Sequence, residues 1–389
     1  MKESTKKNLL SAISYIVVAA LAASITYFTM EGGQQRSKLD ELERLINSCF
    51  IGEVDSTTLE DGAAAGMVAA TGDRWSYYIP ASEFGDYMDQ MNNEYVGIGV
   101  TVSQTEDERG YKVLQVEPDS GAMEAGVLAG DVIYSIDGSL LTEIGFENGS
   151  AKIKGEENTQ VELGIYRGEE TLTLKVTRKK ILVVVAEGQM LADNIGRVTI
   201  NNFDERCAEE TIAAIDKLVA DGAKALIFDV RFNPGGYKKE LELILDHLLP
   251  AGRIFHTVDY TGKEEFTDSD ADCLEMPMAV LMNDSSYSAA EFFAAALDEY
   301  DYAILVGEPT TGKGYFQSTF KLSDGSAVGL SIGKYFTPVK GRSLAEEGGL
   351  QPEILVEVDE ETYSKLYSNL LTPEEDPQIQ AAVNALLGK

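Results

Sequence analysis

The sequence predicts a multidomain α/β (α+β) protein, and three observations support this fold class. At about 150 residues per domain, 389 residues allow two or three domains. A hydrophobic content of 44% is sufficient for real cores. Along the chain, an uncharged leader is followed by a helical region, a glycine-punctuated region and a long alternation of helix-like and strand-like segments.

The first element is an uncharged stretch at residues 8–30. As a helix, its ~23 residues would span a bilayer core. Lys2, Lys6 and Lys7 precede it, so the amino end is expected in the cytoplasm and the rest outside. We therefore interpret residues 1–35 as a cytoplasmic stub and a transmembrane anchor. A cleaved signal peptide ending near Ala20-Leu-Ala22, which would give a secreted protein, is the alternative.

The second region, residues 36–91, is predicted to be helical. Lys38–Phe50 carries a stripe of apolar residues at helical spacing: Leu39, Leu42, Leu45 and Ile46. Thr58–Ala70 is a second helical candidate.

The third region, residues 92–179, contains a Gly-Ile-Gly turn before a strand and further glycines at Gly126, Gly130 and Gly155. Main-chain amides in such a turn can bind the terminal carboxylate of a peptide that adds a strand alongside. This region resembles a PDZ domain of the bacterial protease type. The resemblance implies a tail-binding loop formed by Gly97, Ile98, Gly99 and Val100.

The fourth region, residues 180–389, reads as alternating helix and strand. Helices are predicted at Ala208–Ala220, Tyr237–Leu249, Ala289–Leu297 and Asp376–Leu387. Strands are predicted at Ala225–Val230, Met278–Met282, Ala303–Val306 and Tyr315–Leu322.

Ser288 falls where the strand Met278–Met282 gives way to the helix that starts at Ala289. A helix start supplies free N–H groups that can stabilise developing negative charge. A serine becomes a nucleophile only if a neighbour removes its proton. The two histidines, His247 and His256, lie in no hydrolase motif, so Lys313 is the candidate base.

Four blocks in this region are similar to the ordered core motifs of the carboxyl-terminal processing peptidases, also called tail-specific proteases, of the S41 serine peptidase family. They are Asp229–Gly236, Ser286–Glu291, Gly312–Gln317 and Tyr335–Pro338 with Gly349–Glu353. The resemblance implies an α/β serine-protease core at residues 180–389 in which Ser288 attacks, Lys313 transfers the proton and Gln317 orients the lysine. It also implies an oxyanion hole formed by Ala289 with Gly235 or Gly236.

The geometry of Lys313 and Gln317 sets a condition on this arrangement. In a regular strand the two residues would stand ~13 Å apart. A turn or a bulge is therefore needed for direct contact, and Gly312 and Gly314 could permit it.

The composition of the chain restricts the classes of molecule that it is expected to bind. A formal charge of −33 argues against nucleic acid, which requires a basic surface. Cys49, Cys207 and Cys273 show no metal-like spacing, so neither a metal nor a cofactor is predicted. The expected partners are protein or peptide substrates with free carboxyl-terminal tails, and the membrane through the amino-terminal helix. The family resemblance adds a homodimer formed through the helical region, with a simple packing subdomain as the alternative.

The predicted function is that of a membrane-anchored serine endopeptidase that selects substrates by their carboxyl-terminal tails. A non-catalytic PDZ protein that tethers or senses partners, with a relic protease core, is the alternative. An esterase or amidase acting on small molecules would use the same pair of residues but would leave the PDZ domain without a purpose.

Overall fold

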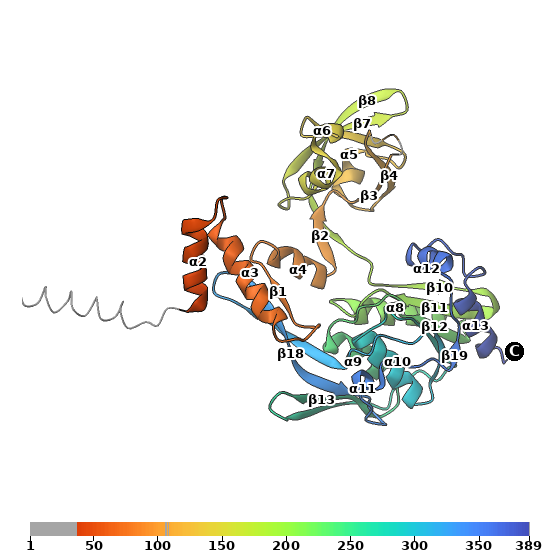
Figure 1. Cartoon of the computed structure of the whole chain (residues 1–389). Helices are drawn as coiled ribbons and strands as arrows, with labels where there is room; N and C mark the ends of the chain where they lie inside the picture. The colour runs from red at the N-terminus through yellow and green to blue at the C-terminus, as the bar shows by residue number, and fades with distance from the viewer. Residues whose placement is uncertain (1–36, 106, 108, 389) are drawn as a thin grey trace, which may run out of the picture. The chain divides into compact units, whose positions relative to one another are not determined.

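The computed structural model describes residues 37–388 except 106 and 108, and it divides after Tyr78 into two units (Figure 1). The predicted anchor at residues 1–35 lies outside the described residues. Within the described part, no helix has the length and apolar character needed to cross a membrane.

The first unit contains two helices, α2 (Lys38–Cys49) and α3 (Ser56–Ala69), as predicted. Ser37 and Asp40 form a capping box at the start of α2, because each main-chain N–H donates to the side chain of the other residue. The leucines of the α2 stripe remain between 45% and 54% exposed. Strand β1 (Tyr77–Ile79) crosses the division between the two units.

The second unit begins with α4 (Phe84–Met91) and a small β domain. Strands β2 (Glu94–Gly97) and β9 (Lys179–Leu182) pair antiparallel where the chain enters and leaves this domain. The domain's antiparallel sheet has the order β3-β4-β5-β7-β8, with β6 beside β5. These strands are β3 (Val100–Gln104), β4 (Tyr111–Val116), β5 (Val132–Ile136), β6 (Ser139–Leu140), β7 (Gln160–Arg167) and β8 (Glu170–Thr177). Its helices are α5 (Gly121–Ala125), α6 (Leu141–Ile144) and α7 (Phe146–Ile153).

The main sheet of the larger α/β domain has the order β10-β11-β12-β15-β16-β19. Only the pairing of β10 with β11 is antiparallel, so the carboxyl ends of the other strands lie at one edge. The strands are β10 (Ala186–Met190), β11 (Ile195–Ile200), β12 (Ala225–Asp229), β15 (Met278–Met282), β16 (Ala303–Gly307) and β19 (Ile354–Leu355); a 3₁₀ turn, η1 (Ala192–Asn194), precedes β11.

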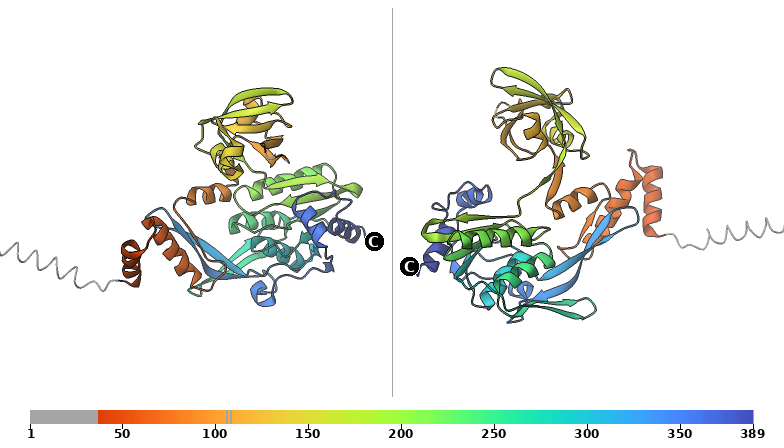
Figure 2. Two further views of the ribbon diagram at one scale, coloured as in Figure 1. Left: turned by 45° about the horizontal axis from the view of Figure 1, so that its top comes forward. Right: turned by 180° about the vertical axis from the view of Figure 1, so that it is seen from behind.

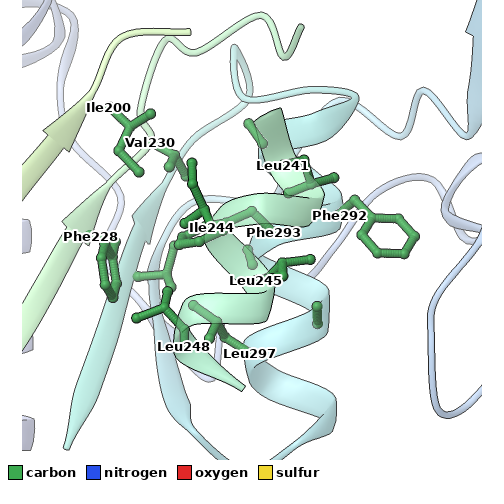
Figure 3. Packing of buried hydrophobic residues seen from close by; sticks show 14 of the residues in the cluster. Ile200, Phe228, Val230, Leu241, Ile244, Leu245, Leu248, Phe292, Phe293 and Leu297 are labelled. Carbon is green, nitrogen blue, oxygen red and sulfur yellow. The ribbon is translucent and has the colours of Figure 1, made fainter. Parts of the chain in front are cut away.

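Helices cover both faces of this sheet because its strands carry apolar residues on both sides. On one face α8 (Cys207–Ala220), α9 (Lys238–Leu248) and α10 (Ala289–Glu299) lie side by side (Figure 2). Phe228 of β12 and Phe293 of α10 meet edge to face in the core beneath them (Figure 3). On the other face α13 (Pro377–Leu386) packs on the alternate residues of the strands. The four helices predicted in residues 180–389 are thereby confirmed to within two residues.

A second antiparallel sheet contains β17 (Tyr315–Lys321), β18 (Ala327–Phe336), β13 (Gly252–Asp259) and β14 (Glu264–Ser269) in that order. The sequence predicted β17, but it gave no sign of the β13–β14 hairpin because this segment is rich in charged and polar residues. The remaining helices are the short α11 (Leu344–Glu347) and α12 (Glu360–Tyr367).

The loop between β11 and α8 contains an unusual buried acid, Asp204. This residue is 4% exposed, and its Oδ1 has no hydrogen-bond partner among the described residues. Burial, together with the charge of Glu205, raises the pKa of Asp204 to about 7. The neighbouring titratable groups, Tyr287 and Cys207, bring no positive charge. The folded protein therefore holds a proton on Asp204 that the unfolded chain releases near pH 4.

Because the folded-state pKa of Asp204 lies above its unfolded value, stability is expected to fall as the pH rises from about 4 to about 7 and then to level off. The raised pKa of Asp204 corresponds to a loss of about 4 kcal/mol in the free energy of unfolding over this pH range. Asp204→Asn should remove most of this loss. Urea unfolding at pH 5 and pH 8 measures this loss of stability. The matched control is Glu209→Gln, which removes one negative charge from an exposed position. Equal pH dependence in the two variants would contradict the assignment.

Candidate active site

Ser288 lies at the tight turn between β15 and α10, as the sequence predicted. Its backbone has φ 59° and ψ −121°, a conformation that non-glycine residues rarely adopt. Such strain costs about 1–3 kcal/mol and persists only where the surroundings enforce it. The next residue, Ala289, opens α10, so its N–H group has no acceptor within the helix.

The turn before Ser288 is fixed by Asn283 and Ser286, both fully buried. Ser286 Oγ donates to the main-chain oxygen of Val230 at 2.8 Å and accepts from the N–H of Asn283 at 3.0 Å. Asn283 Oδ1 in turn accepts from the N–H of Phe232 at 3.0 Å. These bonds join the turn after β15 to the loop after β12.

That loop, Phe232–Gly236, is held from the other side by Asn233. Its amide nitrogen donates to the main-chain oxygen of Ile200 at 2.7 Å, and its main-chain oxygen accepts from the N–H of Tyr287 at 3.1 Å. Gly235 passes so close to the serine that an added Cβ would lie 2.6 Å from Ser288 Cβ. Its φ of 88° is also favourable only for glycine. The glycine is therefore required by the close approach of the two loops.

The sequence left open whether Gly235 or Gly236 completes the oxyanion hole with Ala289. The N–H of Gly235 donates to Asn233 Oδ1 at 2.8 Å. The N–H of Gly236 has no hydrogen-bond acceptor among the described residues. Gly236 is thus the available donor of the pair.

Glu291, in the first turn of α10, is a fully buried carboxylate on which four donors converge. Its Oε2 accepts from the N–H of Ser288 at 3.0 Å and from the N–H of Lys313 at 2.9 Å. Its Oε1 accepts from the N–H of Gly312 and the hydroxyl of Thr310, both at 2.6 Å. One side chain therefore binds the backbone of both predicted catalytic residues.

Lys313 is half-buried, and its Nζ lies 5.7 Å from the centre of the Tyr287 ring. Tyr287 directly precedes Ser288, so the lysine head group and the serine belong to one locality. Lys313 is followed by Gly314, whose φ of 61° and close approach to Ala345 exclude larger residues.

Tyr335 of β18 holds Gly314 in two ways. The N–H of Gly314 donates to the Tyr335 hydroxyl at 3.0 Å, and the N–H of Tyr335 donates to the oxygen of Gly314 at 3.2 Å. Tyr335 is 4% exposed, and burial together with the charge of Glu291 raises its pKa well above its usual value, although hydrogen bonds with the backbone of Gly314 and the side chain of Ser288 oppose the shift. The raised pKa favours the protonated phenol.

Gln317 lies on β17 beside β18. Its amide nitrogen donates to Ser331 Oγ at 2.9 Å and to the oxygen of Tyr315 at 3.4 Å. The pairing of β17 with β18 shifts register between Phe316 and Gln317, but the extra residue, Ile332, lies on β18 and not between Lys313 and Gln317. The orienting role of Gln317 remains a prediction.

A buried ion cluster supports the loop from below. Arg231 donates to both oxygens of Asp229 at 2.8 and 2.6 Å and also contacts Asp376 at 2.9 Å. Burial alone would raise the pKa of Asp229, but the charge and hydrogen bonds of Arg231 lower it. Each histidine faces a carboxylate on a neighbouring element: His247 faces Asp216 and His256 faces Glu264.

In the small β domain, the Gly97-Ile-Gly99 turn links β2 to β3. The oxygens of Ile98 and Gly99 accept from Ala122 and Glu117. Among the described residues, the N–H groups of Ile98 and Gly99 have no main-chain acceptor. Gly99 has φ 76°, and an added Cβ would lie 2.3 Å from Ser120 Cβ. The turn therefore presents unpaired donors beside β3.

The sequence did not single out Glu291 or Tyr335. Both lie inside motifs that it did recognise, and the only available signal for Glu291 was an acidic residue three positions after the serine, where a capping box would place it. The described residues contain no group of three or more histidine, cysteine, aspartate or glutamate side chains arranged to hold a metal ion.

Comparison with known proteins matches both domains. The profile of peptidase family S41 matches residues 194–356, and that of the PDZ domain matches residues 96–177. These ranges fall within the predicted regions 180–389 and 92–179. A Bacteroides fragilis structure assigned to the S41 proteases shares the fold, with a TM-score of 0.53 and 16% identity over 91% of this chain and 97% of that one.

Two curated relatives extend the match over most of the chain. The carboxy-terminal processing protease CtpA of Bacillus subtilis is 31% identical over 94% of this chain and 80% of its own length. A CtpA-like serine protease of Staphylococcus haemolyticus is 27% identical over 88% of this chain and 69% of its own length. The chain therefore belongs to the carboxy-terminal processing proteases of peptidase family S41, which are serine peptidases.

Proposed function

We propose that this protease cleaves its substrates with Ser288 as the nucleophile and Lys313 as the general base. The observation that carries the proposal is the position of Glu291, whose Oε2 accepts from the backbone N–H groups of both residues. No histidine contact competes for the role of base, since His247 and His256 each face a carboxylate on another element.

In the first half of the reaction, Ser288 Oγ attacks the scissile carbonyl carbon while a neutral Lys313 amine takes the hydroxyl proton. The N–H groups of Ala289 and Gly236 stabilise the oxyanion of the tetrahedral intermediate. The C–N bond then breaks, and the lysine returns the proton to the leaving amine. An ester links Ser288 to the acyl half of the substrate, and water hydrolyses it with Lys313 again as the base.

The donors and the base are placed before substrate arrives. Gly235 and Asn233 bring the Phe232–Gly236 loop against Ser288, while Glu291 and Tyr335 fix the backbone on either side of Lys313. We assign to Gln317 the orientation of the lysine head group. Such preorganisation is favourable because no further ordering is needed in the transition state.

We further propose that the PDZ domain selects substrates by their carboxyl-terminal tails. The unpaired N–H groups of Ile98 and Gly99 suit a terminal carboxylate, and the tail would continue as a strand beside β3 at Val100. Protein substrates with free tails are what a PDZ-containing carboxy-terminal processing protease implies.

We also propose that residues 1–35 anchor the protein in the cell membrane with the catalytic part outside the cytoplasm. The support is the uncharged run at residues 8–30 behind three lysines. Sedimentation with membranes, lost when residues 1–36 are deleted, tests the anchor. Release of a shortened soluble protein from intact cells would instead favour signal cleavage.

The helical region is proposed to pair with a second copy of the chain. The leucine stripe of α2 is about half exposed, and α2 contains no buried residue. Sedimentation velocity of the protein and of its Leu42→Glu variant tests this pairing, and an unchanged oligomeric state in the variant would exclude α2 from it.

For the catalytic pair, Ser288→Ala should abolish proteolysis, and Lys313→Arg should reduce kcat about 10²- to 10⁴-fold because a guanidinium stays protonated. Combining the two changes should cause no further loss. Cleavage of an unfolded protein substrate measures this, with the exposed Lys321→Arg on β17 as the matched control. Near-normal activity in Lys313→Arg would overturn the assignment of the base.

For tail recognition, a peptide with a free apolar carboxyl terminus should bind about 10- to 100-fold more tightly than its carboxamide, as expected for charge-assisted hydrogen bonds. Gly99→Ala should weaken binding because its Cβ would collide with Ser120. Gly168→Ala is the matched control, since Gly168 also has a positive φ but lies in open space. Equal affinities for the free-acid peptide and its carboxamide would exclude tail selection by the PDZ domain but would leave the proposed peptidase mechanism unaffected.

For lysine positioning, Tyr335→Phe should leave the buried N–H of Gly314 without its side-chain acceptor, at a cost of about 1–3 kcal/mol. We expect kcat to fall about 10- to 100-fold with little change in KM, and the pH profile to shift because the lysine backbone moves. Tyr315→Phe on β17 is the control. A fully active Tyr335→Phe enzyme with an unchanged pH profile would show that the hydroxyl has no positioning role.

A further inference from the structure

A cavity of about 290 Å³ lies on the sheet face that also carries α13. Its floor includes Glu187 of β10 and Arg197 of β11. Its walls include Phe232 from the loop after β12, Leu366 and Tyr367 of α12, and Leu371 from the segment that follows α12. The volume equals that of about ten water molecules in the liquid, which is space for a small organic molecule.

The cavity contains two arginines that differ in their partners. The guanidinium of Arg231 is fully engaged by Asp229, Asp376 and Gln378. Arg197 forms no ion pair among the described residues, and its Nε is buried without a hydrogen-bond partner. That Nε has no accessible surface, so only the terminal guanidinium nitrogens of Arg197 can meet a ligand in the cavity, and no hydrogen bond to them is found among the described residues. A carboxylate matches the planar guanidinium best.

The charges around Arg197 restrict the ligand further. Arg197 and Arg231 are balanced by Asp229 and Asp376, and the exposed Glu187 leaves one negative charge in excess. A phosphate or a simple carboxylate would add to this excess. A zwitterion adds no net charge, and its ammonium group has a partner in Glu187.

Part of the remaining wall is apolar or aromatic and suits a hydrophobic side chain; it is formed by Phe232, Leu366, Tyr367 and Leu371. The rest of the wall is polar, with Thr199, Asn201 and Asn369. Phe232 meets the rings of Tyr363 and Tyr367 edge to face, at 5.2 and 5.5 Å between ring centres. Phe232 is also held at φ 60°, and it opens the loop that ends at Gly236. A molecule in the cavity would therefore press on the first residue of that loop.

We propose that this cavity is a binding site for a free apolar α-amino acid, with its carboxylate on Arg197, its ammonium group toward Glu187 and its side chain against Phe232 and Leu366. Occupation alters the catalytic rate through Phe232, and this second part rests on the proposed oxyanion role of Gly236. A free apolar amino acid is also the smallest fragment that trimming of a hydrophobic tail could release.

Calorimetric titration of the full-length Ser288→Ala protein with L-leucine tests the site independently of catalysis. One saturable site is expected. Arg197→Gln should weaken binding at least tenfold and Arg197→Lys less, because lysine keeps the charge without the fork of donors. The matched control is Arg253→Gln, an exposed arginine on β13 that should bind leucine normally. Leucinamide and N-acetyl-leucine, which each lack one charge, should both bind clearly worse.

The absence of saturable binding up to the solubility limit of leucine would overturn the site. Equal binding by Arg197→Gln, Arg197→Lys and the parent protein, or by leucinamide and leucine, would do the same. In the active enzyme, leucine should change kcat, and this change should disappear in Arg197→Gln. Normal binding with an unchanged kcat would overturn the coupling through Phe232 but would leave the proposed binding site in place. An inactive parent enzyme that still binds leucine would instead point to a failure of the proposed catalytic pair.

Discussion

The arrangement of the candidate active site depends on the carboxylate of Glu291. This side chain has no exposed surface, and it accepts hydrogen bonds from the backbone at Ser288, Gly312 and Lys313 and from a threonine hydroxyl. A buried carboxylate without such donors would be strongly destabilising. The need to satisfy Glu291 therefore forces two segments that are distant in sequence to meet at fixed positions. It also helps to enforce the strained backbone of Ser288, which would otherwise relax.

The second constraint is the close contact between the loops that follow β12 and β15. Parallel neighbouring strands place these loops at the same edge of the sheet. The side chain of Asn283 then accepts from the N–H of Phe232, and the main-chain oxygen of Asn233 accepts from the N–H of Tyr287. Gly235 permits an approach of the two loops that any Cβ would block. Ser288 and the N–H groups proposed as oxyanion donors are thus positioned by rigid backbone rather than by mobile side chains, and the buried pair of Arg231 and Asp229 supports the loop beneath.

The sequence predicted the elements whose periodicity is strong. The helix α8 was recognisable from apolar residues at helical spacing. The strands β12 and β15 were recognisable because burial on both sheet faces gives a continuous apolar run. The β13–β14 hairpin was missed because both strands carry many polar side chains and belong to a peripheral sheet. For the proposed site, motifs singled out Ser288 and Lys313. The roles of Glu291 and Tyr335 depend on hydrogen bonds between distant segments, which no local pattern encodes.

Burial has different consequences for the two acidic residues Glu291 and Asp204. Both are nearly inaccessible to solvent and flank the same pair of loops. Glu291 accepts hydrogen bonds from four donors, so its burial fixes the positions of the segments that supply them. Asp204 leaves one oxygen unpaired beside another acid, so its burial raises its pKa to about 7 and makes the loop sensitive to pH. The loop of Asp204 also contacts the residue before β2, where the chain enters the PDZ domain, because the side-chain amides of Asn202 and Asn93 form two hydrogen bonds of 2.7 and 3.1 Å. Asp204, with its unpaired oxygen, therefore lies beside both the Phe232–Gly236 loop and the connection to the PDZ domain.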